Sequence, residues 1–286
     1  MPPEARKNMN RENNSRSAPI TRSPDHRITR SFSRPQALVA YVTCGDPNIN
    51  TTRDIVLSAI SAGADIVELG VPFSDPVADG PVIQRASERA LQHHTSLHDV
   101  LDLARDIRKQ SDAGLIVFSY LNPILRYGLK RFCEQAAVAG VDGALITDLT
   151  VEEADEYRSL MAAQKLATIF LAAPTSTDER LKRIAQASSG FVYAVSRTGV
   201  TGTQQQLASD AKDLVRRIRK YTKLPVAVGF GISTARQFAQ VGKFADAAVV
   251  GSAIVQAVEQ NPGREAQAVA ELISSLKGSS AARTNG

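Results

Sequence analysis

The chain has 286 residues, of which 43% are apolar and 22% charged, and its formal net charge is +5. This composition is ordinary for a globular enzyme and unlike that of a fibrous, disordered or membrane protein. The two cysteines, Cys44 and Cys133, form no CxxC pair or disulfide framework, which favours a reducing, cytoplasmic location.

The positive charge lies at the N-terminus. Residues 1–36 hold eight Lys or Arg against three acids, which leaves 26 of each sign in residues 37–286. Because the body is neutral, we expect neither a nucleic-acid groove nor a membrane partner. Residues 1–24, rich in Asn, Ser, Pro and Arg, are predicted to be a disordered basic leader. A transit peptide is the alternative, although the leader lacks a clear amphipathic pattern.

From residue 37 onward, short apolar, β-branched runs alternate with longer amphipathic segments, as parallel strands and their covering helices do. Strands are predicted at residues 37–45, 64–72, 114–122, 141–149, 167–174, 190–197, 224–231 and 245–252. Helices are predicted at 51–63, 96–110, 129–140, 151–166, 178–189, 207–221 and 233–243, with a final pair after 252. Thr150 and Glu153 have capping-box spacing at the start of the fourth of these helices.

Eight such units predict a single-domain (β/α)8 TIM barrel over residues 25–278, followed by a flexible tail at 279–286. The alternative is an open, doubly wound sheet. Even spacing without a second domain favours closure, and no GxGxxG follows the first strand. In a barrel, the loops at the C-terminal ends of the strands hold the site, and these loops are polar and rich in glycine here.

Three late loops carry glycines where barrel enzymes bind phosphate: GVTG (199–202), GFG (229–231) and GSA (251–253). Each glycine alone could serve only a tight turn, but the three together indicate a small phosphate monoester as substrate. The expected donors are the backbone amides of Gly202, Gly231, Gly251 and Ser252, together with the Ser252 hydroxyl.

The stretch VELGVPFSDPVADGP (67–81) begins as an apolar strand and continues as a loop that contains acids. Strand alternation puts Glu68 on one face with Ile66, and this face points either into the barrel or toward the covering helices. Both surroundings are mainly apolar, so burial without a partner would raise the carboxyl pKa. Glu68 is then a tuned acid/base at the ligand mouth or, alternatively, a residue paired with a polar neighbour. Asp75 and Asp79 in the loop could also be turn formers. A metal site is not expected, because no second ligand cluster is evident.

The motif ELGVPFSDPVADGPVIQ (68–84) resembles the signature of the tryptophan synthase alpha subunit family. The resemblance covers about residues 26–277 and extends through YVTCGDP, NPILRYG, APTST, SRTGVTG, GFGIST and GSAIV. It implies retro-aldol cleavage of indole-3-glycerol phosphate to indole and D-glyceraldehyde 3-phosphate. The sequence departs from the family pattern at Thr150, where proline is usual, and at Leu121, where an aromatic residue is commoner.

The resemblance also implies roles for individual residues. Glu68 matches the family's general acid/base, and Asp79 matches the acid that accepts the indole N–H hydrogen bond. Asp75 matches a loop residue that faces the partner subunit. The implied substrate-binding residues are Tyr193, Thr201, Gly202, Phe230, Gly231, Gly251 and Ser252, with Thr201 in a loop that closes over substrate.

The implied partner is a tryptophan synthase beta subunit, in an alpha2-beta2 heterotetramer to which indole passes for tryptophan synthesis. Pyridoxal phosphate is expected in that beta subunit, and no cofactor is expected in this chain. Two alternatives stay open. One is a free-standing lyase of the same fold that releases indole, and the other is a non-catalytic activator of the beta subunit. Intact Glu68, Asp79 and Thr201 argue against the activator.

Overall fold

Eight parallel strands close into a barrel in chain order, as the sequence predicts. The computed structural model describes residues 27–33, 36–195, 204–229 and 231–281. The strands are β1 (Ala37–Thr43), β2 (Ile66–Gly70), β3 (Gly114–Ser119), β4 (Gly143–Ile146), β5 (Ala167–Ala172), β6 (Val192–Val195), β7 (Val226–Gly229) and β8 (Ala247–Val250). All eight predicted strands are present, and within the described residues each is shorter than the apolar run that predicts it. The leader at 1–24 lies outside the described residues.

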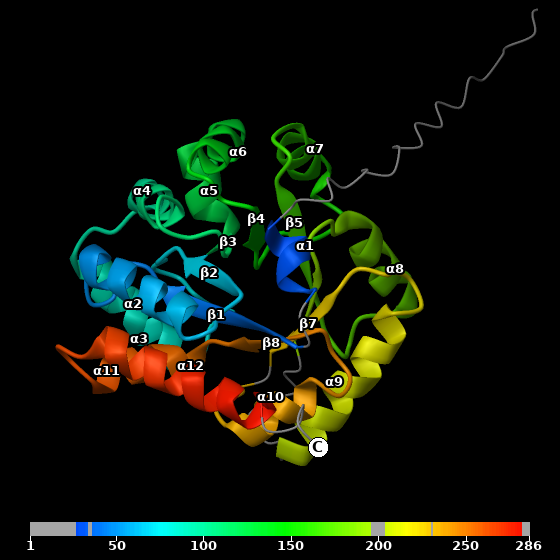
Figure 1. The fold of residues 1–286 in the computed structure, drawn as a ribbon. Helices are drawn as coiled ribbons and strands as arrows, with labels where there is room; N and C mark the ends of the chain where they lie inside the picture. The colour runs from blue at the N-terminus through cyan, green and yellow to red at the C-terminus, as the bar shows by residue number, and fades with distance from the viewer. Residues whose placement is uncertain (1–26, 34–35, 196–203, 230, 282–286) are drawn as a thin grey trace, which may run out of the picture.

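The helices surround the strands, and the short α1 lies near the centre of the ring (Figure 1). Those within the described residues are α1 (Arg27–Ser31), α2 (Ile49–Ser61), α3 (Pro81–Gln92), α4 (Leu97–Arg108), α5 (Leu121–Tyr127), α6 (Leu129–Val138), α7 (Asp155–Ala163), α8 (Asp178–Ala187), α9 (Gln204–Ile218), α10 (Ala235–Val241), α11 (Ser252–Gln260) and α12 (Glu265–Ala281). Sequence analysis did not predict α1, α3 or α5. Helix α3 begins with Pro81, directly after the loop of prolines, acids and glycine.

The capping-box prediction at Thr150 was wrong. Helix α7 begins at Asp155, and its N-cap Ala154 makes no side-chain cap. The Thr150 hydroxyl donates to the Glu153 carboxylate over 3.2 Å, and the Glu153 backbone N–H donates to the Thr150 carbonyl. The expected side-chain pair therefore forms, but it closes a turn before the helix instead of opening the helix.

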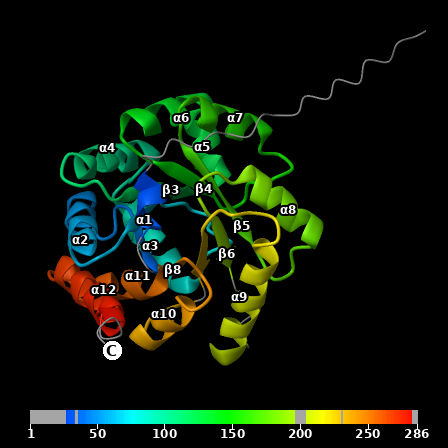
Figure 2. The same cartoon turned by 45° about the vertical axis from the view of Figure 1, so that its right-hand side comes forward.

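Alternation along the strands divides the core in two. Ile66 and Ile116 belong to a buried cluster inside the barrel. Val67 and Leu69 belong to the larger cluster between the sheet and the helices. On that outer layer, α12 packs beside α2 and α11, and both views show the three helices together (Figures 1 and 2). Within the described part of the chain, no helix combines the length and apolarity that a membrane span requires.

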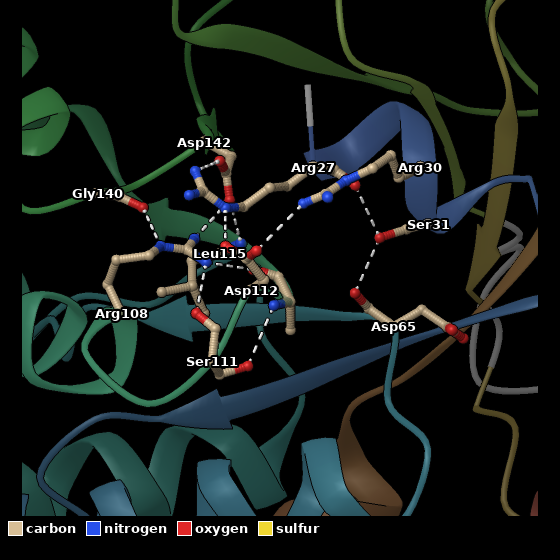
Figure 3. A network of polar contacts seen from close by, with 11 residues as sticks. Arg27, Arg30, Ser31, Asp65, Arg108, Ser111, Asp112, Leu115, Gly140 and Asp142 are labelled. Carbon is tan, nitrogen blue, oxygen red and sulfur yellow. Dashed lines mark hydrogen bonds and ion pairs between the residues drawn. The ribbon is translucent and has the colours of Figure 1, made fainter. Parts of the chain in front are cut away.

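Helix α1 covers the N-terminal end of the barrel (Figure 3). Its Ile28 is fully buried in the interior cluster, and the rings of Phe32 and Phe191 lie 5.6 Å apart between centroids. The Ser31 hydroxyl donates to the backbone carbonyl of Asp65, just before β2, over 3.0 Å. This end is thus filled by side chains, which leaves the C-terminal end for a ligand.

Asp142 is the centre of a polar network at this N-terminal end (Figure 3). Its carboxylate accepts hydrogen bonds from the Arg108 guanidinium over 2.7 Å and from the Leu115 backbone N–H over 2.9 Å. Arg27 of α1 contacts the other oxygen over 3.4 Å. Asp142 is 4% exposed, so its charge depends on these partners.

Replacing Asp142 with Ala should therefore lower the free energy of unfolding by about 3 kcal/mol, because Arg108 is left without its carboxylate in a poorly hydrated site. Urea unfolding monitored by circular dichroism measures this loss. The matched control is Asp155→Ala, since the Asp155 side chain is 90% exposed beside Arg158 and the change should be within error. Equal effects of the two substitutions would contradict the role given to Asp142.

Candidate active site

Glu68 lies inside the barrel near the C-terminal end of β2. All five residues of β2 are buried, and Ile66, two residues before Glu68, belongs to the interior cluster. Strand alternation therefore points Glu68 into the interior, which decides between the two faces that the sequence leaves open. In register, Glu68 pairs with Tyr41 of β1 and Ile116 of β3.

The Glu68 carboxyl group is fully buried, and neither oxygen has a hydrogen-bond partner among the described residues. A polar partner for Glu68 is the alternative that the sequence allows, and the described residues supply none. Desolvation raises the carboxyl pKa from 4.5 to about 8. A carboxyl group with this pKa is mainly protonated at neutral pH and can both give and take a proton there.

Two tyrosines share this part of the interior. Burial raises the pKa of Tyr41 and of Tyr193 well above the usual value, and the charges of Glu68 and Asp79 add to the shift in each. Tyr193 is predicted from the sequence to line the site, whereas no sequence prediction gives Tyr41 a role. The signal for Tyr41 is its place on an inward-facing strand position opposite Glu68.

Small residues make room for both rings. A Cβ atom added at Gly229 would lie 2.6 Å from the Tyr193 hydroxyl oxygen, and one added at Gly70 would clash with the Tyr41 hydroxyl. These glycines therefore serve close approach to a side chain. Any larger residue at either position would push a tyrosine out of its present place.

Asp79 is held at the end of the loop that joins β2 to α3. The Tyr120 hydroxyl donates to its carboxylate over 3.0 Å, and the Ala78 backbone N–H donates to the Tyr120 oxygen over 2.9 Å. Burial, together with the Asp79 charge, raises the pKa of Tyr120, which is 3% exposed. The neighbouring carboxylate thus keeps this hydroxyl in its donor form.

Sequence analysis gave Tyr120 no role. The available signal was its position directly after β3, at the end of the barrel where site residues gather. Asp75, in the same loop as Asp79, is exposed and accepts from the Ser74 hydroxyl over 2.6 Å. Val77 between the two acids is 86% exposed, so the outer part of the loop faces solvent in the isolated chain.

The expected phosphate end lies beside Tyr41. Helix α11 begins at Ser252 with Gly251 as its N-cap, so the first backbone N–H groups of the helix have no intrahelical partner. A Cβ atom added at Gly251 would be 3.6 Å from the Tyr41 Cβ. Gly231 has φ of +79°, which glycine adopts readily. Thr201, Gly202 and Phe230 lie outside the described residues.

The described residues thus place a buried carboxyl group, the buried Tyr41, the partly buried Tyr193 and a helix N-terminus around one end of the barrel. They contain no group of three or more His, Cys, Asp or Glu side chains that could hold a metal ion. An acid/base group without a partner among the described residues, at the same end of the barrel as a helix N-terminus that favours an anion, suits proton transfer on a phosphorylated substrate.

Comparisons with known proteins identify relatives with this architecture. A family model described as "Tryptophan synthase alpha chain" matches residues 30–284. The tryptophan synthase alpha chain of Solibacter usitatus (strain Ellin6076) is 53% identical over 226 residues, which are 79% of this chain and 85% of that protein. The corresponding protein of Geotalea daltonii is 45% identical over 90% of this chain and 99% of its own length.

A solved structure agrees in shape. The crystal structure of the tryptophan synthase alpha chain from Legionella pneumophila subsp. pneumophila has a TM-score of 0.83 and 35% sequence identity to this chain. The match covers 91% of this chain and 99% of that one. The likeness thus holds over nearly the whole barrel.

The raised pKa of Glu68 predicts a pH-dependent stability difference. The folded state binds this proton more tightly than the unfolded state, so the group's contribution to stability falls as pH rises from about 4.5 to about 8. Wild type should therefore lose roughly 4 kcal/mol relative to Glu68→Gln between pH 5 and pH 9.

Urea unfolding of both proteins at pH 5, 7 and 9 measures this difference, because contributions of other groups cancel. Glu156→Gln, at an exposed position of α7, is the matched control and should give a constant difference from wild type. A constant difference for Glu68→Gln as well would show that Glu68 has an ordinary pKa.

Proposed function

Because the chain belongs to the tryptophan synthase alpha chain family, whose reaction is the cleavage of indole-3-glycerol phosphate to indole and D-glyceraldehyde 3-phosphate, we propose that Glu68 and Asp79 perform this chemistry here. The protein is accordingly a lyase of tryptophan biosynthesis. The observation that carries the residue assignment is the fully buried, unpaired Glu68 carboxyl group, with a pKa of about 8, at the C-terminal end of a barrel strand.

The retro-aldol step requires two proton movements. Indole C3 gains a proton, and the hydroxyl on the carbon bonded to C3 loses one. The bond between these two carbons then breaks, its electron pair returns to the ring, and an aldehyde forms. One carboxyl group that is protonated at rest can give the first proton and take the second, which is the role we assign to Glu68. Its apolar surroundings keep it protonated until substrate arrives.

Protonation at C3 leaves positive charge on the indole ring, centred on the nitrogen. An anionic carboxylate that accepts the indole N–H hydrogen bond stabilises this charge as it develops, and we assign this role to Asp79. The Tyr120 hydroxyl supports it by donating to Asp79. The aromatic ring of Tyr193, partly buried and close enough for the Glu68 charge to raise its pKa, provides a wall for the indole in this proposal.

The substrate phosphate is assigned to the glycine-rich loops and to the start of α11. The backbone N–H groups of Gly251 and Ser252 lie at the N-terminus of α11, which is the positive end of the helix dipole and favours an anion. Gly202, Phe230 and Gly231 complete this part of the proposal, and Thr201 is proposed to contact Asp79 when its loop closes.

Alpha chains of this family act with a beta subunit. We propose an alpha2-beta2 assembly in which indole passes to the beta subunit and in which pyridoxal phosphate belongs to that partner. Asp75 is proposed to face it, and its exposure in the isolated chain supports this. The cytoplasmic location expected from the sequence is part of the same proposal.

Glu68→Gln should retain the fold and ligand binding but abolish cleavage, since an amide cannot exchange the proton. The assay is indole release from indole-3-glycerol phosphate by the full chain, with and without a beta subunit, and Glu156→Gln is the matched control. Near-normal turnover in Glu68→Gln would overturn the assigned role. Strong release without the partner would indicate a free-standing lyase, and no release under either condition an activator.

Tyr120→Phe should lower kcat about tenfold with little change in KM, because the hydrogen bond it removes matters most when the ring is charged. The control is Tyr157→Phe, whose buried hydroxyl donates to the Ala144 carbonyl over 2.9 Å between α7 and β4. That variant should lose stability and keep its kcat. If both variants kept wild-type kcat, Tyr120 would have no part in holding Asp79.

A further inference from the structure

Two helices carry the two ends of the proposed site. Helix α3 begins immediately after the loop that contains Asp79, and the first turn of α11 supplies the proposed phosphate donors. The two helices lie side by side, and Ala86 of α3, Val255 of α11 and Tyr41 of β1 form one buried apolar cluster. The relative placement of α3 and α11 therefore sets the distance between the acids and the phosphate.

Helix α11 is held both by apolar packing and by polar contacts. Its Ile254 and Val258 are buried in the large cluster between the sheet and the helices. A small pocket beside these two residues is also lined by Asp46, which follows β1. The polar contacts of Asp46 therefore lie next to the packed face of α11.

Those polar contacts come from two arginines of α3. Arg85 and Arg89 are four residues apart, so they share one face of the helix. Arg85 binds both carboxylate oxygens of Glu259 over 2.9 and 2.8 Å. Arg89 donates to Glu259 over 2.8 Å and also binds both oxygens of Asp46 over 2.8 Å each. Through these contacts Arg89 joins three elements: α3, α11 and the end of β1.

The position of Glu259 in α11 explains why its contacts with Arg85 and Arg89 matter. It is the penultimate residue of α11, where the negative end of the helix dipole disfavours a carboxylate. Hydrogen bonds from Arg85 and Arg89 lower its pKa to about 2, so it stays charged beside them. Asp46 is 3% exposed, and a buried charge without a partner is strongly unfavourable. Loss of Arg89 would leave Glu259 with Arg85 but without Arg89, and Asp46 without this guanidinium, so the contact between Asp46 and α11 through Arg89 would be lost.

We propose that Arg89 is a positioning residue that holds Asp46 and Glu259 together and thereby aims the N-terminus of α11 at the substrate phosphate. This inference rests on the proposed function, in which Gly251 and Ser252 bind that phosphate. The phosphate takes no part in bond breaking, so its contacts are the same in the ground state and the transition state. Weakening them raises KM and leaves kcat nearly unchanged.

Arg89→Met keeps most of the side-chain volume and removes the guanidinium. In the full chain assayed with a beta subunit, it should raise KM for indole-3-glycerol phosphate about tenfold and change kcat by less than about twofold. The inhibition constant of inorganic phosphate as a competitor should rise by a similar factor. Arg89→Lys should give an intermediate KM, because an ammonium group cannot bind both carboxylates as the planar fork does.

The matched control is Arg108→Met, which removes a guanidinium from the network at the opposite end of the barrel. It should lower the unfolding temperature and leave KM and phosphate inhibition at wild-type values. A purely structural role for Arg89 would give this same pattern, so wild-type KM in both Arg89 variants would overturn the inference.

A double-mutant cycle tests the link to Asp46. Arg89→Met, Asp46→Asn and the double variant should raise KM by similar factors, because both single changes break the same contact. Additive effects would contradict a joint action. If the wild type released no indole from indole-3-glycerol phosphate, the proposed function would fail and the inference with it. An active wild type with unaffected Arg89 variants would overturn the inference alone.

Discussion

Closure of the parallel sheet is the constraint on which the rest of the structure depends. Each of the eight strands bonds to two neighbours, so alternate residues must point either into the interior or toward the helices. The interior is narrow and mainly apolar, and Glu68 has one of its positions. Its unusual proton affinity follows from this geometry, because no described side chain compensates for the water lost on burial.

The two ends of the barrel use charged side chains in different ways. At the N-terminal end, Asp142 and Arg108 satisfy each other and close the core beneath α1. At the opposite end, the Asp79 carboxylate contacts a tyrosine hydroxyl and is only partly buried. This arrangement leaves Asp79 accessible to a substrate. In the network at the N-terminal end, by contrast, the Asp142 carboxylate already has its hydrogen-bond donors within the protein.

The proposed function assigns the reaction and the binding of substrate to different parts of the barrel. Proton transfer is assigned to a carboxyl group on a rigid strand, which suits a step that depends on precise placement. Charge stabilisation is assigned to a loop, and phosphate binding to a helix end with partial positive charge. Because these parts belong to different βα units, packing between units has to keep them in register. The contacts of Arg89 with Asp46 and Glu259 are suited to that purpose.

The sequence by itself determined the barrel, since eight apolar runs at regular spacing identify eight buried strands. It also determined that Glu68 shares a face of β2 with Ile66, since alternation is a local property, whereas the tertiary structure decided that this face is the interior. The sequence was a weaker guide to where individual helices begin. Thr150 and Glu153 form their pair in a turn before α7, and α3 begins after a loop whose sequence did not predict a helix. Only the tertiary structure decided that Glu68 has no described partner, that Tyr120 holds Asp79 and that Arg89 joins three elements. These facts depend on residues far apart in the chain, whose distances arise only when the sheet closes.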